Sequence, residues 1–156
     1  MKTSFARSLT AMALGLAMHT AFAADTGPVA EDKLATARAQ IAAKQWRVAI
    51  DELNRVNDSG SADWNNLMGY SLRKAKTPDL DGAEKFYNEA LRIDPKHRGA
   101  LEYSGELYLM KGDLATAEKR LAALDKICRL PCEEYTDLKK AIERYKAAGN
   151  KYVAAQ

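Results

Sequence analysis

Residues 98–124 read RGALEYSGELYLMKGDLATAEKRLAAL, and this stretch decides the fold. Apolar residues recur at intervals of three and four on both sides of Lys111-Gly112-Asp113, as expected for two amphipathic helices. Gly and Asp are typical turn residues, so the three-residue stretch predicts a tight connection between those helices. The stretch therefore indicates a helix-turn-helix unit in which each helix buries one face against the other.

The second half of this unit recurs upstream with a period of 34 residues. Ala49, Ala83 and Ala117 mark the three copies. Matching side chains lie three before, four after and seven after each alanine: Trp46, Leu80 and Leu114; Leu53, Tyr87 and Leu121; Val56, Ala90 and Leu124. These offsets place the residues on one helical face, and the shared small alanine predicts a point where two helices approach closely.

A further helix is expected before each of the later two copies, over residues 65–74 and 100–110. Gly69 and Gly105 lie inside these stretches, where a glycine costs roughly 1 kcal/mol relative to alanine. We expect close packing against a partner helix to compensate for that cost. The turns between helices are marked by Thr77-Pro78-Asp79 and Asp94-Pro95, since proline cannot continue a helix.

Together these residues resemble the tetratricopeptide repeat (TPR) family. Two of the three units carry the small, aromatic and closing residues of that family: Gly69, Ala83, Tyr87, Ala90 and Pro95; Gly105, Tyr108, Gly112, Ala117 and Leu121. The first unit departs by having Ala37 in place of glycine, the second has two extra residues within 76–81, and the third has Arg129 where the family closes on proline. The resemblance covers 31–130 and implies an all-α, right-handed solenoid of about three helix-turn-helix repeats: 31–61, 62–97 and 98–130.

A C-terminal capping helix is expected over 133–148, because a stack of repeats leaves an apolar face that must be covered. Its predicted buried stripe consists of Tyr135, Leu138, Ile142 and Tyr145. Two acidic residues begin the helix and Gly149 follows it, which suits the helix dipole and a glycine stop. We therefore expect a TPR domain over 31–148, a flexible leader at 24–30 and a flexible tail at 149–156.

The first 23 residues have the features of an export signal peptide. Lys2 and Arg7 precede a short apolar run, and Ala21-Phe22-Ala23 gives the pattern at which signal peptidase cuts. The run is shorter than the roughly 20 apolar residues of a spanning helix, so we expect a periplasmic protein, cleaved after Ala23, without stable membrane insertion. Cleavage removes two of the 24 basic residues and none of the 21 acidic ones, which leaves a net charge of +1. So small a charge gives no reason to expect nucleic acid as a partner.

The sequence contains no motif for catalysis or for a cofactor. After cleavage His97 is the only histidine, and it stands in the turn after Pro95 without a nucleophile-elbow serine. There is also no His-Glu-x-x-His motif and no glycine-rich phosphate loop. We therefore expect a protein that is not an enzyme, with no cofactor and no metal site.

Cys128 and Cys132 are the only cysteines, and they flank the predicted joint between the last repeat and the cap. Export favours oxidation, and two cysteines four residues apart at a helix end fit a disulfide that staples the cap. Two other interpretations stay open: a redox-labile pair activated by Arg129 and the helix start, or two thiolates that bind a soft metal such as Cu(I). Either would make the chain a thiol-redox or soft-metal-handling accessory protein.

In the proteins that this chain resembles, the first helix of each repeat lines a concave groove that holds a peptide. The resemblance implies these partner-binding residues: Arg38, Asn66, Tyr70, Arg73, Glu102, Tyr103 and Glu106, with Leu34, Ile41 and Met110 beside them. Tyrosine and arginine are frequent anchors of protein interfaces. The lysine and asparagine clamp with which some family members grip a C-terminal carboxylate is absent. We therefore expect an adaptor or scaffold for a protein or peptide of mixed charge, with a homo-oligomer as the alternative.

Overall fold

The computed structural model describes residues 32–130 and 132–154. Seven α-helices lie in these ranges: α1 (Ala35–Ala42), α2 (Trp46–Val56), α3 (Ala62–Lys74), α4 (Leu80–Ile93), α5 (Arg98–Met110), α6 (Leu114–Ile127) and α7 (Glu133–Ala147). No strand occurs among the described residues, which confirms the all-α prediction. None of these helices is long and apolar enough to cross a membrane. The predicted signal peptide and leader lie outside the described residues.

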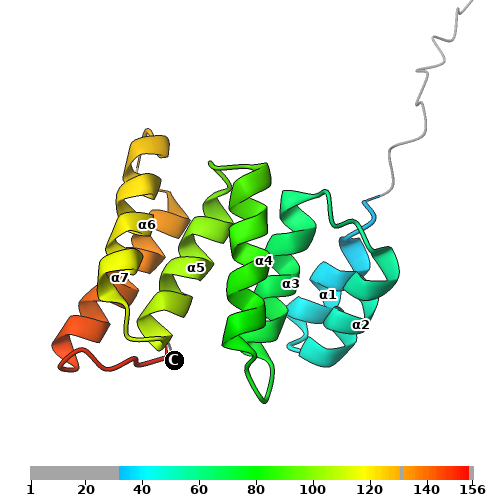
Figure 1. Cartoon of the computed structure of the whole chain (residues 1–156), viewed down its shortest axis with the longest axis horizontal. Helices are drawn as coiled ribbons and strands as arrows, with labels where there is room; N and C mark the ends of the chain where they lie inside the picture. The colour runs from blue at the N-terminus through cyan, green and yellow to red at the C-terminus, as the bar shows by residue number, and fades with distance from the viewer. Residues whose placement is uncertain (1–31, 131, 155–156) are drawn as a thin grey trace, which may run out of the picture. The chain divides into compact units, whose positions relative to one another are not determined.

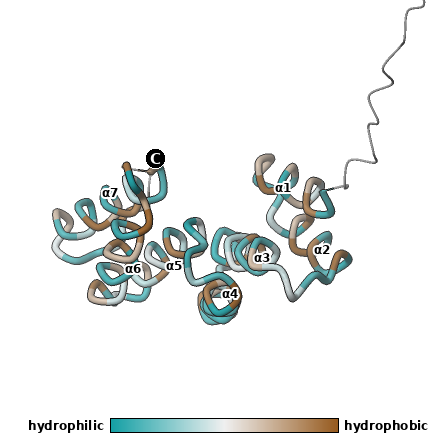
Figure 2. The backbone as a smooth tube through the Cα atoms, turned by 90° about the horizontal axis from the view of Figure 1, so that it is seen from above, coloured by the Kyte–Doolittle hydropathy of each residue, from teal (hydrophilic) through white to brown (hydrophobic). Residues whose placement is uncertain are grey.

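The helices pack as consecutive pairs within residues 32–154. Helix α1 contacts α2, α3 contacts α4, and α5 contacts α6, while α7 packs against both α5 and α6 (Figure 1). Each odd-numbered helix also contacts the next odd-numbered one. Figure 2 shows that α1, α3, α5 and α7 lie on one side and the even-numbered helices on the other. We call the surface of α1, α3, α5 and α7 that points away from the even-numbered helices the odd-helix face.

Side-chain caps fix where four of the helices begin. Each cap accepts a hydrogen bond from the backbone N–H three residues further on: Ser61 from Trp64, Asp79 from Gly82, His97 from Ala100 and Asp113 from Thr116. Such a bond satisfies one of the N–H groups that the first helical turn leaves unpaired. The chain turns after α2 and α5 through left-handed residues, Asn57 with φ 49° and Gly112 with φ 80°.

Small residues mark the places where the helices approach one another most closely. Ala49, Ala83 and Ala117 are fully buried, as their 34-residue spacing predicts. A Cβ atom on Gly69 of α3 would lie 2.9 Å from the Tyr87 ring of α4. Gly105 of α5 has its close contact with the cap, where a Cβ atom would lie 2.6 Å from Leu138 of α7. Both glycines therefore allow the close packing that the sequence predicts.

The two extra residues of the second unit lie in the connection between α3 and α4. Five residues, 75–79, join these helices, whereas three residues join α1 to α2 and α5 to α6. The backbone N–H of Asp79 donates to the carbonyl oxygen of Leu72 over 3.2 Å and closes the longer loop. The insertion is therefore accommodated outside the helix pair, which keeps its packing.

The apolar core runs along the chain as three adjoining clusters. They consist of Leu34, Ala37, Leu53, Trp64 and Met68; of Ala83, Tyr87 and Leu107; and of Leu101, Leu109, Ala117, Leu124, Leu138, Ala141, Ile142 and Tyr145. Leu72 packs against the first two clusters and Tyr108 against the last two, so these side chains link them. Such nearest-neighbour packing is typical of repeat proteins.

We expect Gly69→Ala to destabilise the chain by about 1–2 kcal/mol. The added methyl group would meet the rigid Tyr87 ring at 2.9 Å and the carbonyl oxygen of Ala83 at 3.1 Å. Overpacking of this kind outweighs the gain of roughly 1 kcal/mol in helix propensity. The midpoint of urea unfolding measures the change. Gly60→Ala is the matched control, because a methyl group added there would meet no atom within 4 Å. Equal midpoints for the two variants would contradict the close approach of α3 and α4.

Candidate partner-binding surface

Three aromatic side chains meet where α3 and α5 lie side by side. Tyr70 of α3 and Tyr103 of α5 have ring centroids 4.6 Å apart. Trp46, at the start of α2, approaches the Tyr70 ring edge-on with centroids 5.9 Å apart. Aromatic rings at these separations attract one another beyond the effect of burial alone. All three side chains are half-buried, so the group is held in place and still presents aromatic surface to solvent.

Arg73 lies beneath these rings and is only 3 % exposed. Its guanidinium carbon lies 5.5 Å from the centroid of Tyr70 and 5.8 Å from that of Tyr103, within the range of cation–π attraction. One guanidinium nitrogen lies 2.7 Å from the carboxylate of Glu106. Its Nε also donates to the hydroxyl oxygen of Tyr87 over 3.4 Å. We call Trp46, Tyr70, Arg73, Tyr103 and Glu106 the aromatic–arginine cluster.

The charge of Arg73 is retained despite its burial. Burial alone lowers the pKa of a guanidinium, but Tyr87 and Glu106 raise the pKa of Arg73 by more than burial lowers it. Burial raises the pKa of both Tyr70 and Tyr103, so their phenols stay neutral and keep their O–H donors at neutral pH. The cluster therefore combines one compensated ion pair with two neutral hydrogen-bond donors.

Glu102 stands next to this cluster on α5 and is 8 % exposed. Burial raises the pKa of its carboxyl group to about 8, and Arg73 opposes that rise only in part. Three neighbouring carboxyl groups add to the rise: Glu106, Asp137 and Glu134. No basic side chain of the described residues forms an ion pair with Glu102. At neutral pH the side chain is therefore mostly a neutral acid that can donate a hydrogen bond.

Asn66 lies one helical turn before Tyr70 on α3 and is 7 % exposed. Its Oδ1 is buried and has no hydrogen-bond partner within the described part of the chain. A Cβ atom on Gly99 would lie 3.1 Å from Asn66 Nδ2, so the glycine lets the start of α5 approach this amide. An unpaired buried acceptor costs about 1–3 kcal/mol of stability.

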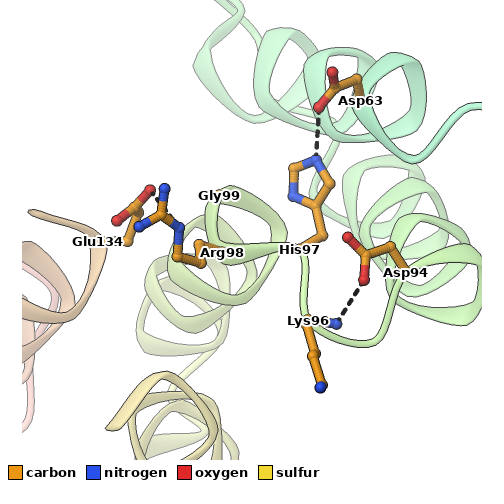
Figure 3. A pocket seen from close by; sticks show the side chains of 7 residues that line it. All are labelled: Asp63, Asp94, Lys96, His97, Arg98, Gly99 and Glu134. Carbon is orange, nitrogen blue, oxygen red and sulfur yellow. Dashed lines mark hydrogen bonds and ion pairs between the residues drawn. The ribbon is translucent and has the colours of Figure 1, made fainter. Parts of the chain in front are cut away.

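Arg38 belongs to a different group of charges, at the first turns of α3 and α5. It pairs with Asp32 at 3.5 Å and with Asp63 at 3.2 Å. The other oxygen of Asp63 lies 2.9 Å from Nε2 of His97 (Figure 3). His97 and Asp63 also line an open pocket of about 300 Å³ together with Asp94, Lys96, Arg98, Gly99 and Glu134. Mixed charges at this end of the surface are thus already engaged with one another.

The structure thus brings together four of the seven predicted residues: Tyr70, Arg73, Tyr103 and Glu106. Glu102 adjoins them, while Asn66 and Arg38 lie toward the start of α3. Sequence reasoning missed Tyr152, which follows α7 and packs half-buried against the last core cluster. The signal for it is Gly149-Asn150, a pair of residues suited to reversing the chain.

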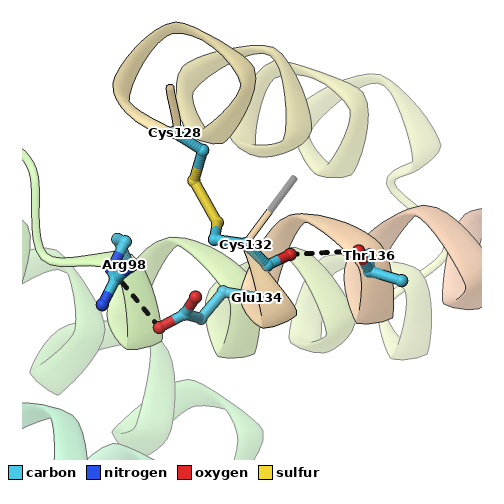
Figure 4. The surroundings of a disulfide bond; sticks show 5 residues. All are labelled: Arg98, Cys128, Cys132, Glu134 and Thr136. Atoms are coloured by element: carbon cyan, nitrogen blue, oxygen red, sulfur yellow. Dashed lines mark hydrogen bonds and ion pairs between the residues drawn. A yellow bond between two sulfur atoms is a disulfide. The ribbon is translucent and has the colours of Figure 1, made fainter. Parts of the chain in front are cut away.

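The two cysteines form a disulfide that joins the end of α6 to the start of α7, with Cα atoms 5.8 Å apart (Figure 4). Cys128 is the C-cap of α6 and Cys132 is the N-cap of α7. The hydroxyl of Thr136 donates to the carbonyl oxygen of Cys132 over 3.0 Å, and Arg98 lies 3.4 Å from Glu134. Among the described residues no group of three or more His, Cys, Asp or Glu side chains is arranged to hold a metal ion. The disulfide therefore fixes the cap against the last helix pair.

Neither the models of known protein families nor the curated proteins compared with this chain match it. The geometry of the odd-helix face is therefore the main guide to what the chain binds.

We expect Glu102→Gln to stabilise the chain increasingly as the pH rises. The folded-state pKa of about 8 lies above the ordinary value of 4.5, so the folded chain holds a proton that the unfolded chain releases. The contribution of Glu102 to the free energy of unfolding therefore falls as the pH rises from 4.5 to 8. Glutamine does not ionise, so the variant does not lose this contribution. The expected gain is on the order of 2–4 kcal/mol at about pH 8 and near zero at about pH 4.

Urea unfolding at a series of pH values measures this difference. Glu143→Gln is the matched control, because it removes an exposed carboxylate from α7. A difference between Glu102→Gln and the wild type that stays the same across this pH range would show that Glu102 ionises normally.

Proposed function

We propose that this chain is a non-enzymatic adaptor or scaffold of the TPR type, exported to the periplasm, which binds a peptide or protein segment on its odd-helix face. The aromatic–arginine cluster is the observation that carries the proposal. Tyrosine, tryptophan and arginine dominate the residues on which protein interfaces depend most strongly. Here these types occur together on α2, α3 and α5, with three half-exposed aromatic side chains above a buried arginine.

The rigidity of the cluster supports binding with little loss of entropy. Arg73 is held by an ion pair, a hydrogen bond and two ring faces, so it does not have to be ordered when a partner arrives. Ordering a flexible side chain at an interface costs about 0.5–1.5 kcal/mol, and this surface avoids much of that cost. A preformed surface of this kind favours an extended segment that adapts to it.

One polar group beside the cluster matches the backbone of such a segment. The protonated carboxyl of Glu102 is a hydrogen-bond donor. A peptide backbone offers carbonyl acceptors at every residue, so it can pair with this group. We therefore propose that Glu102 holds the main chain of the partner while the tyrosines contact its side chains.

The arrangement of helices also supports the TPR assignment. Three helix pairs follow one another with buried alanines at a spacing of 34 residues, and α7 covers the last pair. In the repeat family that this pattern resembles, the layer of first helices is the binding surface. Fold analogy of this kind supports the binding surface that the aromatic–arginine cluster indicates.

We expect Tyr70→Ala combined with Tyr103→Ala to abolish partner capture while the chain stays folded. The double change removes the aromatic surface that α3 and α5 share, and truncating an interface anchor typically costs about 2 kcal/mol or more in binding. Crosslinking of the tagged chain in a periplasmic extract, read by mass spectrometry, measures capture, and circular dichroism checks the fold.

The matched control is Tyr135→Ala, which removes a half-buried tyrosine on α7 beside the disulfide. This variant should capture the same partner as the wild type. Equal capture by the folded double variant and the wild type would exclude the odd-helix face as the binding surface.

The alternative function, a thiol-redox or soft-metal accessory protein, depends on the half-buried pair Cys128 and Cys132. We expect Cys128→Ser combined with Cys132→Ser to retain partner capture and to lose about 2 kcal/mol of stability, since the two cysteines are only four residues apart and close a small loop. Urea unfolding and the same crosslinking measure both quantities. A variant that stays as stable as the wild type but captures no partner would favour the thiol function instead.

A further inference from the structure

The chain reverses direction directly after α7. Gly149 has φ 68° and Asn150 has φ 60°, and both values lie in the left-handed region that glycine and asparagine adopt most readily. The backbone N–H of Asn150 donates to the carbonyl oxygen of Tyr145 over 3.0 Å, which locks the turn at the helix end. Residues 150–154 therefore run back along the domain, toward α5 (Figure 1).

Tyr152 is the residue that this reversal delivers to the odd-helix face. Figure 2 shows the segment that follows α7 on the side of α5 and α7 that points away from α4 and α6. The Tyr152 side chain is half-buried and packs against the last core cluster. Burial raises the pKa of its phenol, Glu106 raises it further, and Arg73 lowers it, which agrees with this position. The tail thus lies on the odd-helix face, on the side that also carries the aromatic–arginine cluster.

We propose that the segment Lys151–Ala154 occupies, within its own chain, the place of a partner peptide, and that the partner is an extended segment that presents a tyrosine side chain in place of Tyr152. This proposal deepens the function proposed above and rests on it. The observation behind it is that a tyrosine from the segment after α7 already packs on the odd-helix face, against the core cluster that α5 and α7 share. The flanking residues Lys151 and Val153 are exposed, so a single side chain carries the contact.

The covalent link to α7 allows the weak contact of Tyr152 to cover part of the odd-helix face. Only a few residues separate Tyr152 from the end of α7, so the side chain is present at an effective concentration on the order of 1 mM. A contact of one half-buried tyrosine is displaced by a longer segment that also pairs with Glu102. The tail therefore excludes weak, unspecific segments and admits those that make more contacts.

The test uses the tail itself as the probe. A synthetic peptide with the sequence of residues 150–156 is titrated into the chain ended after Asn150, into full-length Tyr152→Ala, and into the full-length wild type. Backbone amide NMR signals of Tyr70, Arg73 and Tyr103 report binding. We expect saturable shifts with the first two proteins, and about tenfold weaker binding to the wild type, because its own tail competes.

Two controls isolate the tyrosine. A peptide carrying Tyr152→Ala should bind the shortened chain about tenfold more weakly, and the full-length variant Lys151→Ala should behave like the wild type, because Lys151 is exposed. Equal affinity of the wild type and the shortened chain for the probe would overturn the proposal, as would the absence of shifts in both Tyr152→Ala and the shortened chain. A wild-type dimer in sedimentation that shortening removes would also overturn it, because the tail would then act between two copies.

The outcome is separable from that of the proposed function. Partner capture that depends on Tyr70 and Tyr103 but is unchanged by Tyr152→Ala would remove the role of the tail and leave the binding surface in place. Partner capture that is unchanged by substitution of Tyr70, Tyr103 or Tyr152 would exclude the odd-helix face as the binding surface. Stronger capture by Tyr152→Ala than by the wild type is the result expected when both proposals hold.

Discussion

Close approach between neighbouring helices is the constraint on which the other features of this structure depend. Two helices approach each other most closely where at least one presents a small residue, and here alanine or glycine occupies those points. Gly69 lets Tyr87 of α4 cross beneath α3, and the hydroxyl of that tyrosine then meets Arg73. A larger residue at position 69 would displace the ring and with it the support of the arginine. The geometry of the odd-helix face therefore depends directly on how closely α3 and α4 pack.

The buried arginine converts this packing into a surface of defined shape. An ion pair in a low-dielectric site contributes little net stability, because desolvation of the two charges offsets their attraction. Its effect is orientation: the pair of Arg73 and Glu106 bridges α3 and α5, and the two tyrosine rings lie against the guanidinium. A purely apolar contact would leave these rings free to slide past each other, whereas directional bonds fix them. The charged pair therefore explains why the aromatic side chains are held while remaining half-exposed.

Periodicity is sufficient to predict the helices, since burial of one face repeats every three to four residues and the alanines repeat every 34. The same phase places Tyr70 and Tyr103 on first helices, where the structure finds them in contact. Phase alone does not give the burial of Arg73 or the raised pKa of Glu102, because both depend on side chains of other helices. The position of Tyr152 could not be predicted from periodicity either, since a short tail has no periodic pattern. Only the left-handed pair Gly149-Asn150 indicates that the chain turns there. The TPR assignment itself stays a prediction.

The electrostatics of the cluster limit what kind of recognition it performs. Arg73 and Glu106 neutralise each other, Glu102 keeps its proton at neutral pH, and both tyrosines are uncharged. The formal charges that remain exposed, such as Arg38 and Asp63, are paired at the other end of α3. A surface without net charge gains little from long-range attraction, which acts mainly on association rates. Selection among partners must then come from contact: the fit of an aromatic side chain against Tyr70 and Tyr103, and a hydrogen bond to Glu102. In the proposal above, the tethered Tyr152 offers an aromatic side chain but no hydrogen bond to Glu102, so the two conditions together separate a partner from the tail.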